Sequence, residues 1–188
     1  MIVTLTGASG TGKTTLAKRL LTKLNGARML TSFTTRAARP SDLPGEYEYL
    51  SREALERMRA DGRFQWTTDL SGTSYGTTTE SLRTALEDDG SASIMILVPE
   101  TLPKLYAFAD SLGKRDCIRS FFLLSPPTDV LRERMVSRGD DAASIERRLA
   151  DCAEWEHVAR VSDVPYDYIE DNDSLDEKLM RIVANLAV

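Results

Sequence analysis

IVTLTGASGTGKTT, residues 2–15, joins an apolar run to a glycine-rich loop and then to a helix-forming segment. Residues 2–6 predict a buried strand, and a helix is expected from Lys13 to about Leu24. Between them the sequence matches the pattern G-x-x-x-x-G-K-[ST] in full. In this setting the glycines let the loop wrap tightly, so that its N–H groups and the N-terminus of the helix bind phosphate.

This loop predicts an ATP site that includes Mg²⁺. Lys13 is expected to reach the β- and γ-phosphates as a catalytic cation, and the Thr14 hydroxyl is expected to bind the metal. The loop residues expected to contact ATP are Gly7, Ser9, Gly10, Thr11, Gly12, Lys13, Thr14 and Thr15. The motif specifies nucleotide binding and not the reaction, so the group that accepts a phosphoryl must be sought elsewhere in the chain.

The composition indicates one compact domain. The chain has 188 residues, of which 41% are hydrophobic and 28% are charged, which is enough apolar material for a core without a disulfide or a structural metal. A net charge of −5 argues against a protein that binds nucleic acid or a membrane surface. Cys117, Cys152 and His157 have no metal-site spacing, and neither a signal peptide nor a membrane span is found, so a cytoplasmic location is expected.

Beyond the loop, buried strands alternate with helices, which indicates an α/β fold with a parallel sheet flanked by helices. Residues 32–78 break this rhythm with short extended pieces and one helix, and they indicate an inserted subdomain of mixed α and β structure. Within it, turns are expected at Ser71-Gly72 and at Tyr75-Gly76. The later elements are expected to be helices near 79–88, 101–112, 128–137 and 144–161, strands near 93–98, 119–124 and 166–169, and a terminal helix capped by Asp173 or Ser174.

Several motifs downstream of the loop resemble the guanylate kinases. These are Ser32-Phe33-Thr34-Thr35-Arg36-Ala37-Ala38-Arg39-Pro40, Gly45-Glu46-Tyr47, Ser74-Tyr75-Gly76-Thr77, Arg138-Gly139, Arg148-Leu149 and Asn172-Asp173. They occur in order and span nearly the whole chain. The resemblance implies a P-loop kinase formed by a single domain, 1–188, in which 32–78 is an inserted subdomain that binds a nucleoside monophosphate and 128–150 is a helical lid.

The resemblance also implies a role for each matching residue at the acceptor end. The residues expected to hold the acceptor phosphate are Ser32, Arg36, Arg39, Tyr47 and Tyr75. Two arginines and three hydroxyls are the groups that a dianionic phosphate requires when no metal holds it.

At the ATP end, Arg138 and Arg148 match the lid arginines of the family, which close over ATP and neutralise charge on the transferred group. A catalytic arginine of this kind raises the rate by about three powers of ten or more. Asn172 matches a position near the adenine and completes the expected ATP contacts. The neighbouring Arg132 and Arg134 are interpreted as part of a solvent-exposed helix face.

The sequence departs from the family pattern where the base is recognised. The family has a glutamate just before a tryptophan of the inserted subdomain, and here Gln65 precedes Trp66. An amide presents one acceptor and one donor, so it mispairs with the two adjacent donors of guanine at a cost of about 1–3 kcal/mol. The amide instead matches an adjacent donor–acceptor pair, which thymine, uracil, adenine and a shifted guanine each present. Base recognition is therefore assigned to Gln65 and Thr77 without naming the base.

The strand expected at 93–98 lacks the acidic residues that the family uses for guanine and for the magnesium shell. Binding of Mg²⁺ is then expected to depend on Thr14, the phosphates and water, with Glu100 at the strand end as a candidate substitute for the missing acids.

Three functions remain open from the sequence. The leading one is an ATP-dependent nucleoside or deoxynucleoside monophosphate kinase, with GMP or dGMP as the first acceptor to consider and another monophosphate as the alternative. A second is a kinase of a non-nucleotide phosphate, similar to the ribose 1,5-bisphosphate kinases. A third is a guanylate-kinase-like binding module without catalysis, which the intact Lys13 and lid arginines disfavour. The expected partner is a small molecule, and the chain is expected to be a monomer or a homodimer.

Overall fold

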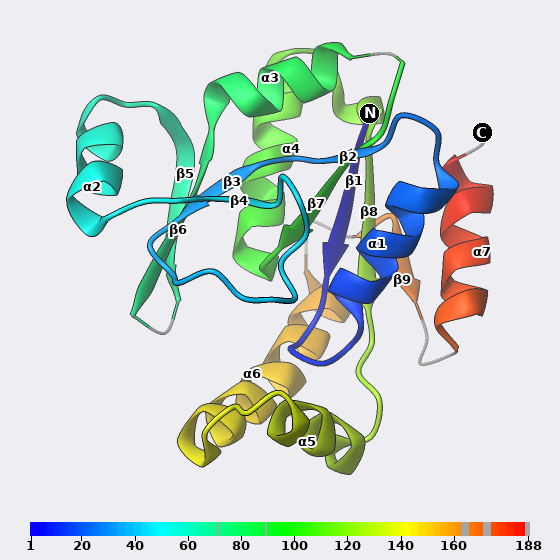
Figure 1. Ribbon diagram of the computed structural model, residues 1–188. Coiled ribbons are helices and arrows are strands. Elements are labelled where there is room, and N and C mark those ends of the chain that lie inside the picture. Colours follow the sequence, from blue (N-terminus) through cyan, green and yellow to red (C-terminus); the bar gives the residue numbers. More distant parts are fainter. Residues whose placement is uncertain (71, 89, 163–165, 171–173, 187–188) are drawn as a thin grey trace.

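A computed structural model describes residues 1–70, 72–88, 90–162, 166–170 and 174–186. Its centre is a five-stranded sheet in which every neighbouring pair is parallel, in the order β2-β7-β1-β8-β9 (Figure 1). The strands are β1 Ile2–Thr6, β2 Arg28–Met29, β7 Ser93–Leu97, β8 Ile118–Leu123 and β9 Tyr168–Glu170. The chain therefore has the predicted α/β P-loop kinase fold.

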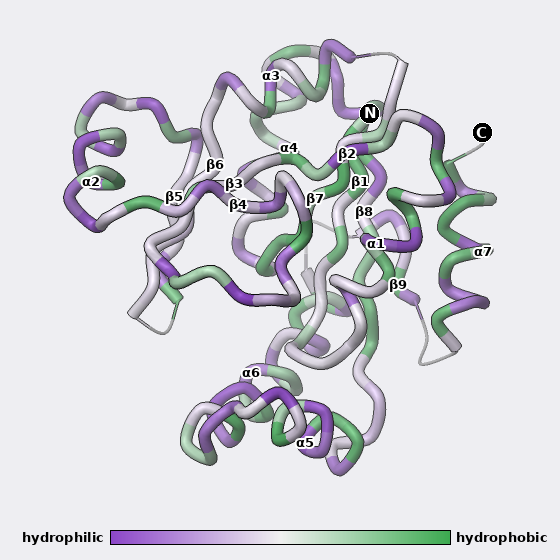
Figure 2. Tube along the Cα trace, viewed as in Figure 1, coloured by the Kyte–Doolittle hydropathy of each residue, from purple (hydrophilic) through white to green (hydrophobic). Residues whose placement is uncertain are grey.

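Helices cover both faces of this sheet, so its central strands are apolar on both sides. One hydrophobic cluster packs α1 (Lys13–Lys23) and α7 (Leu175–Leu186) against one face. The other cluster packs α3 (Thr79–Glu87) and α4 (Leu102–Ser111) against the opposite face. Figure 2 shows the resulting concentration of hydrophobic residues along the strands of the sheet. Short 3₁₀ segments at Pro99–Thr101 and Arg115–Cys117 flank α4.

Residues 32–78, here called the insert, form a second sheet and one helix beside the central sheet (Figure 1). The strand order is β4-β3-β6-β5, with β3 paired parallel to β4 and antiparallel to β6. The elements are β3 Ser32–Thr34, β4 Tyr47–Tyr49, α2 Arg52–Ala60, β5 Phe64–Leu70 and β6 Thr73–Thr78. The mixed strands predicted for this region are therefore present, and Ser51 caps α2 as expected by accepting a bond from the N–H of Ala54 at 3.1 Å.

One of the two turns predicted in the insert is wrong. Gly72 separates β5 from β6 with φ +77°, whereas Ser71 lies outside the described residues. Tyr75 and Gly76 lie inside β6 and pair with β5 and β3. The glycine serves close packing, because a Cβ at Gly76 would lie 2.6 Å from a ring carbon of Phe64.

The third part of the molecule is a helical hairpin, here called the lid, made of α5 (Thr128–Ser137) and α6 (Ala142–Val161). Leu131, Met135 and Ile145 form a small hydrophobic cluster between the two helices. Helix α6 begins two residues earlier than predicted, since Asp141 caps it by accepting a bond from the N–H of Ser144 at 2.9 Å.

At the C-terminal end, Ser174 and Glu177 form a capping box at the start of α7. This confirms one of the two predicted caps, while Asp173 lies outside the described residues. Among the helices described, none has both the length and the apolar character needed to cross a membrane.

Candidate active site

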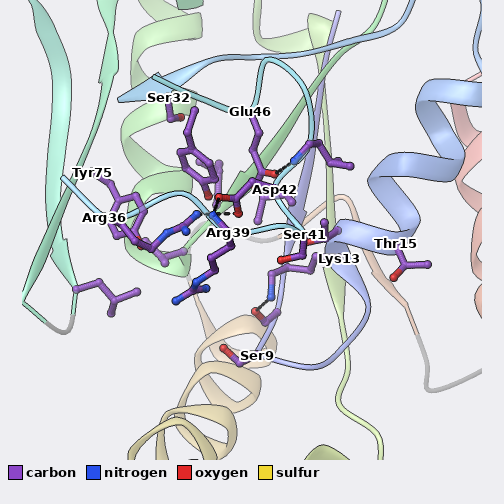
Figure 3. A pocket seen from close by; sticks show the side chains of 18 of the residues that line it. Ser9, Lys13, Thr15, Ser32, Arg36, Arg39, Ser41, Asp42, Glu46 and Tyr75 are labelled. Carbon is purple, nitrogen blue, oxygen red and sulfur yellow. Dashed lines mark hydrogen bonds and ion pairs between the residues drawn. The ribbon is translucent and has the colours of Figure 1, made fainter. Parts of the chain in front are cut away.

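A cavity of about 1060 Å³ opens between the glycine-rich loop, the insert and the lid (Figure 3). The loop supplies one wall and the insert supplies the opposite wall, so that Lys13 and Ser9 face Arg36 and Tyr75 across the space. Most of the residues predicted for the site line this cavity. They are Gly7, Ser9, Gly10, Gly12, Lys13, Thr14, Thr15, Ser32, Arg36, Arg39, Tyr47, Tyr75, Thr77 and Arg138.

The loop has the backbone shape that a phosphate cradle needs. Gly7 and Gly12 have φ angles of +146° and +96°, which residues other than glycine rarely adopt. At Gly7 there is also no room, because a Cβ would lie 2.5 Å from the carbonyl oxygen of Leu123. Thr11 is an exception among the predicted ATP contacts: it does not line the cavity, and its hydroxyl donates to the carbonyl of Ala8 at 2.9 Å and so closes the loop.

Lys13 is the cation at the centre of the site. Its ammonium group donates to the carbonyl oxygens of Gly7 and Ala8, both at 2.7 Å. Burial, and after it the positive charges of Arg138 and Arg148, lower the pKa of Lys13 to about 8. Three cations therefore converge at this point, which is an arrangement suited to a polyanion such as a triphosphate.

The lid arginines point to one shared carboxylate. Arg138 and Arg148 bind the same oxygen, Oδ2 of Asp140, at 2.8 and 3.0 Å. Arg138 lines the cavity, whereas Arg148 does not. The structure thus brings both predicted arginines together, and it does so through an aspartate that sequence reasoning missed.

Arg134 was also missed. Its guanidinium donates to the carbonyl oxygen of Gly10 at 2.7 Å, and it lines the cavity beside Arg138. The spacing of four residues between Arg134 and Arg138, which places both side chains on one helix face, was the signal that could have found it. Arg132 behaves as predicted for a solvent-exposed face, because it is paired with the exposed Glu146 on the next helix.

At the acceptor end, a carboxylate again organises an arginine. The Arg36 guanidinium binds Oδ1 of Asp42 at 2.8 Å, while Oδ2 accepts from the Tyr49 hydroxyl and the Arg39 N–H, both at 2.7 Å (Figure 3). Burial alone raises the pKa of Asp42, but these three hydrogen bonds outweigh it and hold that pKa below its usual value. Asp42 was not predicted, although an acid six residues after Arg36 in a proline- and glycine-rich loop is within reach of it.

The remaining predicted acceptor residues surround Arg36. Its guanidinium lies over the ring of Tyr47, 5.1 Å from the centroid, and the rings of Tyr47 and Tyr75 are 6.0 Å apart. Burial raises the pKa of Tyr47, so this hydroxyl stays protonated and able to donate a hydrogen bond. The Ser32 hydroxyl lies 3.4 Å from that of Thr77. These five predicted phosphate ligands and Thr77 therefore share one wall.

Gln65 does not occupy the place predicted for it. Trp66 and Thr68 of β5 line the cavity and Gln65 does not, because successive side chains of a strand point to opposite faces. The register of β5 against β6 also shifts between Phe64 and Trp66. The side-chain oxygen of Gln65 accepts a hydrogen bond from the Thr79 hydroxyl at 3.3 Å.

The end of β7, the strand that lacks acidic residues, gives the cavity an apolar wall. Ile96, Leu97 and Val98 line the cavity there. Glu100 is exposed and does not line it, so its predicted part in the magnesium shell has no support from its position. In the described part of the chain, no group of three or more His, Cys, Asp and Glu residues is placed to hold a metal ion. Asn172 lies outside the described residues.

Buried Glu46 is a further lining residue that was not predicted. It is 6% exposed, its carboxylate accepts the N–H of Leu43 at 2.9 Å, and burial raises its pKa. Its negative charge acts on Lys13 from the insert side of the cavity.

Comparison with known proteins identifies the family to which this site belongs. A family model described as guanylate kinase matches residues 1–187. The chain belongs to the guanylate kinase family. The guanylate kinase of Thiobacillus denitrificans is 35% identical over 184 residues, covering 94% of this chain and 80% of that protein. The guanylate kinase of Neisseria gonorrhoeae is 34% identical over 178 residues, covering 94% and 82%.

A solved structure also supports the fold of this guanylate kinase family member. The crystal structure of guanylate kinase from Anaplasma phagocytophilum matches with a TM-score of 0.70 at 23% identity. The match covers 100% of this chain and 84% of that one. The resemblance drawn from the motifs is therefore confirmed, and so is the fold that it implied.

Proposed function

We propose that the chain is an ATP-dependent nucleoside or deoxynucleoside monophosphate kinase, which converts a monophosphate and ATP to a diphosphate and ADP, with GMP or dGMP as the first acceptor. The observation that carries this proposal is the pairing of two phosphate sites in one cavity. The loop around Lys13 lies on one side, and the ring of acceptor residues around Arg36 lies on the other. Two such sites face to face serve transfer between two phosphates.

The cavity residues fit the two substrates of this reaction. The positive-φ loop, the N-terminus of α1 and Lys13 suit the triphosphate of ATP. Arg36, Arg39 and the two tyrosines suit the acceptor phosphate. The Thr14 hydroxyl, which lines the cavity at the first turn of α1, is the protein ligand proposed for Mg²⁺. When bound, Mg²⁺ neutralises charge on the phosphates.

The transfer needs no covalent intermediate and no general base. An oxygen of the acceptor phosphate is already anionic and attacks the γ-phosphorus of ATP. The bond from that phosphorus to the β–γ bridging oxygen breaks, and its electron pair leaves with ADP. Lys13, Arg138 and Arg148, together with Arg134, are the cations proposed to stabilise the charge on the transferred group, while closure of the lid excludes water.

The insert, 32–78, is proposed as the acceptor-binding subdomain of a single domain, and residues 128–150, which are the part of the α5–α6 hairpin that carries Arg138 and Arg148, are proposed to close over ATP. Thr77 is proposed to contact the base, while Ser32, whose hydroxyl lies 3.4 Å from that of Thr77, is proposed to hold the acceptor phosphate together with Arg36. The lack of acidic residues in β7 favours one second candidate, a kinase of a sugar phosphate similar to the ribose 1,5-bisphosphate kinases, because such an acceptor has no base to recognise.

One experiment separates these proposals. The protein is incubated with ATP, Mg²⁺ and, in turn, each nucleoside monophosphate, each deoxynucleoside monophosphate and ribose 1,5-bisphosphate, and ADP formation is measured. Turnover with one or more nucleotides is expected. Turnover with the sugar phosphate alone would replace the first proposal by the second, and no turnover with any acceptor would support a binding module without catalysis. The same proposal includes a cytoplasmic enzyme that acts as a monomer or a homodimer.

The place of Gln65 is tested in the same assay. If Gln65 turns toward the base when the acceptor binds, Gln65→Glu is expected to raise kcat/KM for GMP or dGMP by about 5- to 150-fold, the equivalent of 1–3 kcal/mol. If it keeps its bond to Thr79, the order of preference among the acceptors stays as in the unmodified protein.

A further inference from the structure

We propose that Asp140 is a positioning residue, which gathers Arg138 and Arg148 at one point before the nucleotide arrives. This inference rests on the proposed phosphoryl transfer. Its basis is the geometry of the turn between α5 and α6, where one carboxylate oxygen binds both guanidinium groups at 2.8 and 3.0 Å.

The backbone of this turn fixes where the carboxylate lies. Gly139 has φ +80°, and its N–H donates to the carbonyl of Val136 at 2.9 Å. The N–H of Asp140 donates to the carbonyl of Met135 at 3.1 Å. This pair of bonds is a Schellman motif, which ends α5 and sets the direction of the next residue. The side chain of Asp140 is 18% exposed, so it is held on the inner side of the turn.

The two arginines come from different helices of the lid and meet at the carboxylate of Asp140. Arg138 ends α5, and Arg148 lies on α6, eight residues after Asp140. Arg138 lines the same cavity as Lys13, and the positive charges of both arginines lower the pKa of Lys13. Without a counter-charge, three cations at one place repel one another and favour an open, spread arrangement. One carboxylate offsets part of this repulsion and leaves a net positive site for phosphate.

A second ion pair on the same hairpin provides a matched comparison. Arg132 of α5 and Glu146 of α6 also join the two helices. Their side chains are 46% and 62% exposed, and neither lines the cavity. Removal of the Glu146 carboxylate takes one ion pair from the lid and removal of the Asp140 carboxylate takes two, but only Asp140 binds arginines that act on Lys13.

The test compares Asp140→Asn with Glu146→Gln, using the acceptor that the unmodified protein turns over best. Asp140→Asn is expected to lower kcat by about 10- to 100-fold, because the arginines are no longer held in place. The KM for the acceptor is expected to change by less than about threefold. Glu146→Gln is expected to leave both constants unchanged, and Asp140→Glu to restore part of kcat. Equal kcat in both amide variants, or a higher kcat in Asp140→Asn, would overturn the proposal.

A second measurement is independent of turnover. Arginine modification by phenylglyoxal is followed by mass spectrometry on the protein without nucleotide. Faster modification of Arg138 and Arg148 is expected in Asp140→Asn than in the unmodified protein or in Glu146→Gln, and equal rates would contradict the inference. If the unmodified protein turns over no acceptor, the proposed function fails by itself, and these rates still decide whether Asp140 holds the arginines.

Discussion

The acceptor end of the cavity and the lid both use an aspartate to hold arginine, but they differ in burial. At the acceptor end, the side chains of Arg36 and Asp42 are only 10% and 13% exposed, and Asp42 accepts two further hydrogen bonds from the insert. In the lid, Arg138 is 45% exposed and Asp140 binds the arginines alone among the bonds recorded for its side chain in the described residues.

This difference indicates an order of events. A buried pair whose carboxylate oxygens both accept hydrogen bonds is rigid and largely formed before the ligand binds. An arginine as exposed as Arg138, which shares one carboxylate oxygen with Arg148, is less constrained and can exchange the carboxylate for a phosphate at little cost. The acceptor site is therefore expected to be preformed, and the lid to be completed by ATP.

The largest effect is expected at Lys13, which belongs to the common centre of the cavity. Lys13→Met removes a donor aimed at the transferred group, so kcat is expected to fall by about 10²- to 10³-fold. Lys23→Met, in the exposed last turn of the same helix, is the control and is expected to keep kcat. Steady-state kinetics with saturating ATP and acceptor measure both. A loss of less than about tenfold would show that the lid arginines carry the charge stabilisation alone.

The next effect separates the two ends. Arg36→Ala removes charge-assisted bonds to the acceptor phosphate, which are worth about 1.5–3 kcal/mol, so the KM for the acceptor is expected to rise about 10- to 150-fold. The KM for ATP is expected to stay constant, because the acceptor site is built independently of the lid. Arg57→Ala, on the exposed helix of the insert, is the control. An equal rise in both KM values would contradict a preformed acceptor site.

The charge of Lys13 makes both ATP binding and stability depend on pH. Since the pKa of Lys13 is lowered to about 8, the ligand-free protein loses this proton as the pH rises through 8, whereas the unfolded chain keeps it until about 10.5. As the pH rises from 8 to 10.5, the free energy of unfolding therefore increases, because the unfolded chain still binds the proton that the folded protein has lost. Over the same range ATP binding weakens, because Lys13 loses its positive charge. The Kd for ATP is expected to rise by up to about tenfold per pH unit above 8. Titrations at several pH values measure it, and the same slope in Lys13→Met would assign it to another group.

The sequence was most informative where the function depends on a local segment. The strand, loop and helix at 2–23 were predicted correctly because the glycine spacing and the apolar run act over neighbouring residues. The residues proposed to hold the acceptor phosphate were named from short motifs that resemble the guanylate kinases, and all of them line the cavity. For the inserted subdomain, the presence of strands was predictable, but the turn proposed at Tyr75-Gly76 was wrong, since the pairing of β6 with two other strands and the ring of Phe64 decide that backbone.

The features that the sequence left out depend on contacts between distant segments. The face of β5 that lines the cavity, and with it the side on which Gln65 lies, depends on how β5 pairs with β6. The bond from Arg134 to Gly10 joins residues 124 positions apart. Asp42 and Asp140 become visible as site residues only when the turns that carry them are folded. Charge patterns along a helix do not tell which of several arginines faces a loop from another part of the chain.

The smallest effect is expected at Arg132, and it sharpens the contrast within the lid itself. Arg132 and Arg134 lie two residues apart on α5, yet one pairs with the exposed Glu146 and the other binds the phosphate loop. Exposed ion pairs contribute little to stability, so Arg132→Ala is expected to shift the melting temperature by less than about 2 °C. Its kcat is expected to match that of the unmodified protein, whereas Arg134→Ala is expected to lower kcat at least about tenfold. Kinetics on the two variants measured in parallel decide the point: similar losses would mean that the lid acts through its overall charge, and a loss confined to Arg134 would mean that it acts through the arginines that reach the loop.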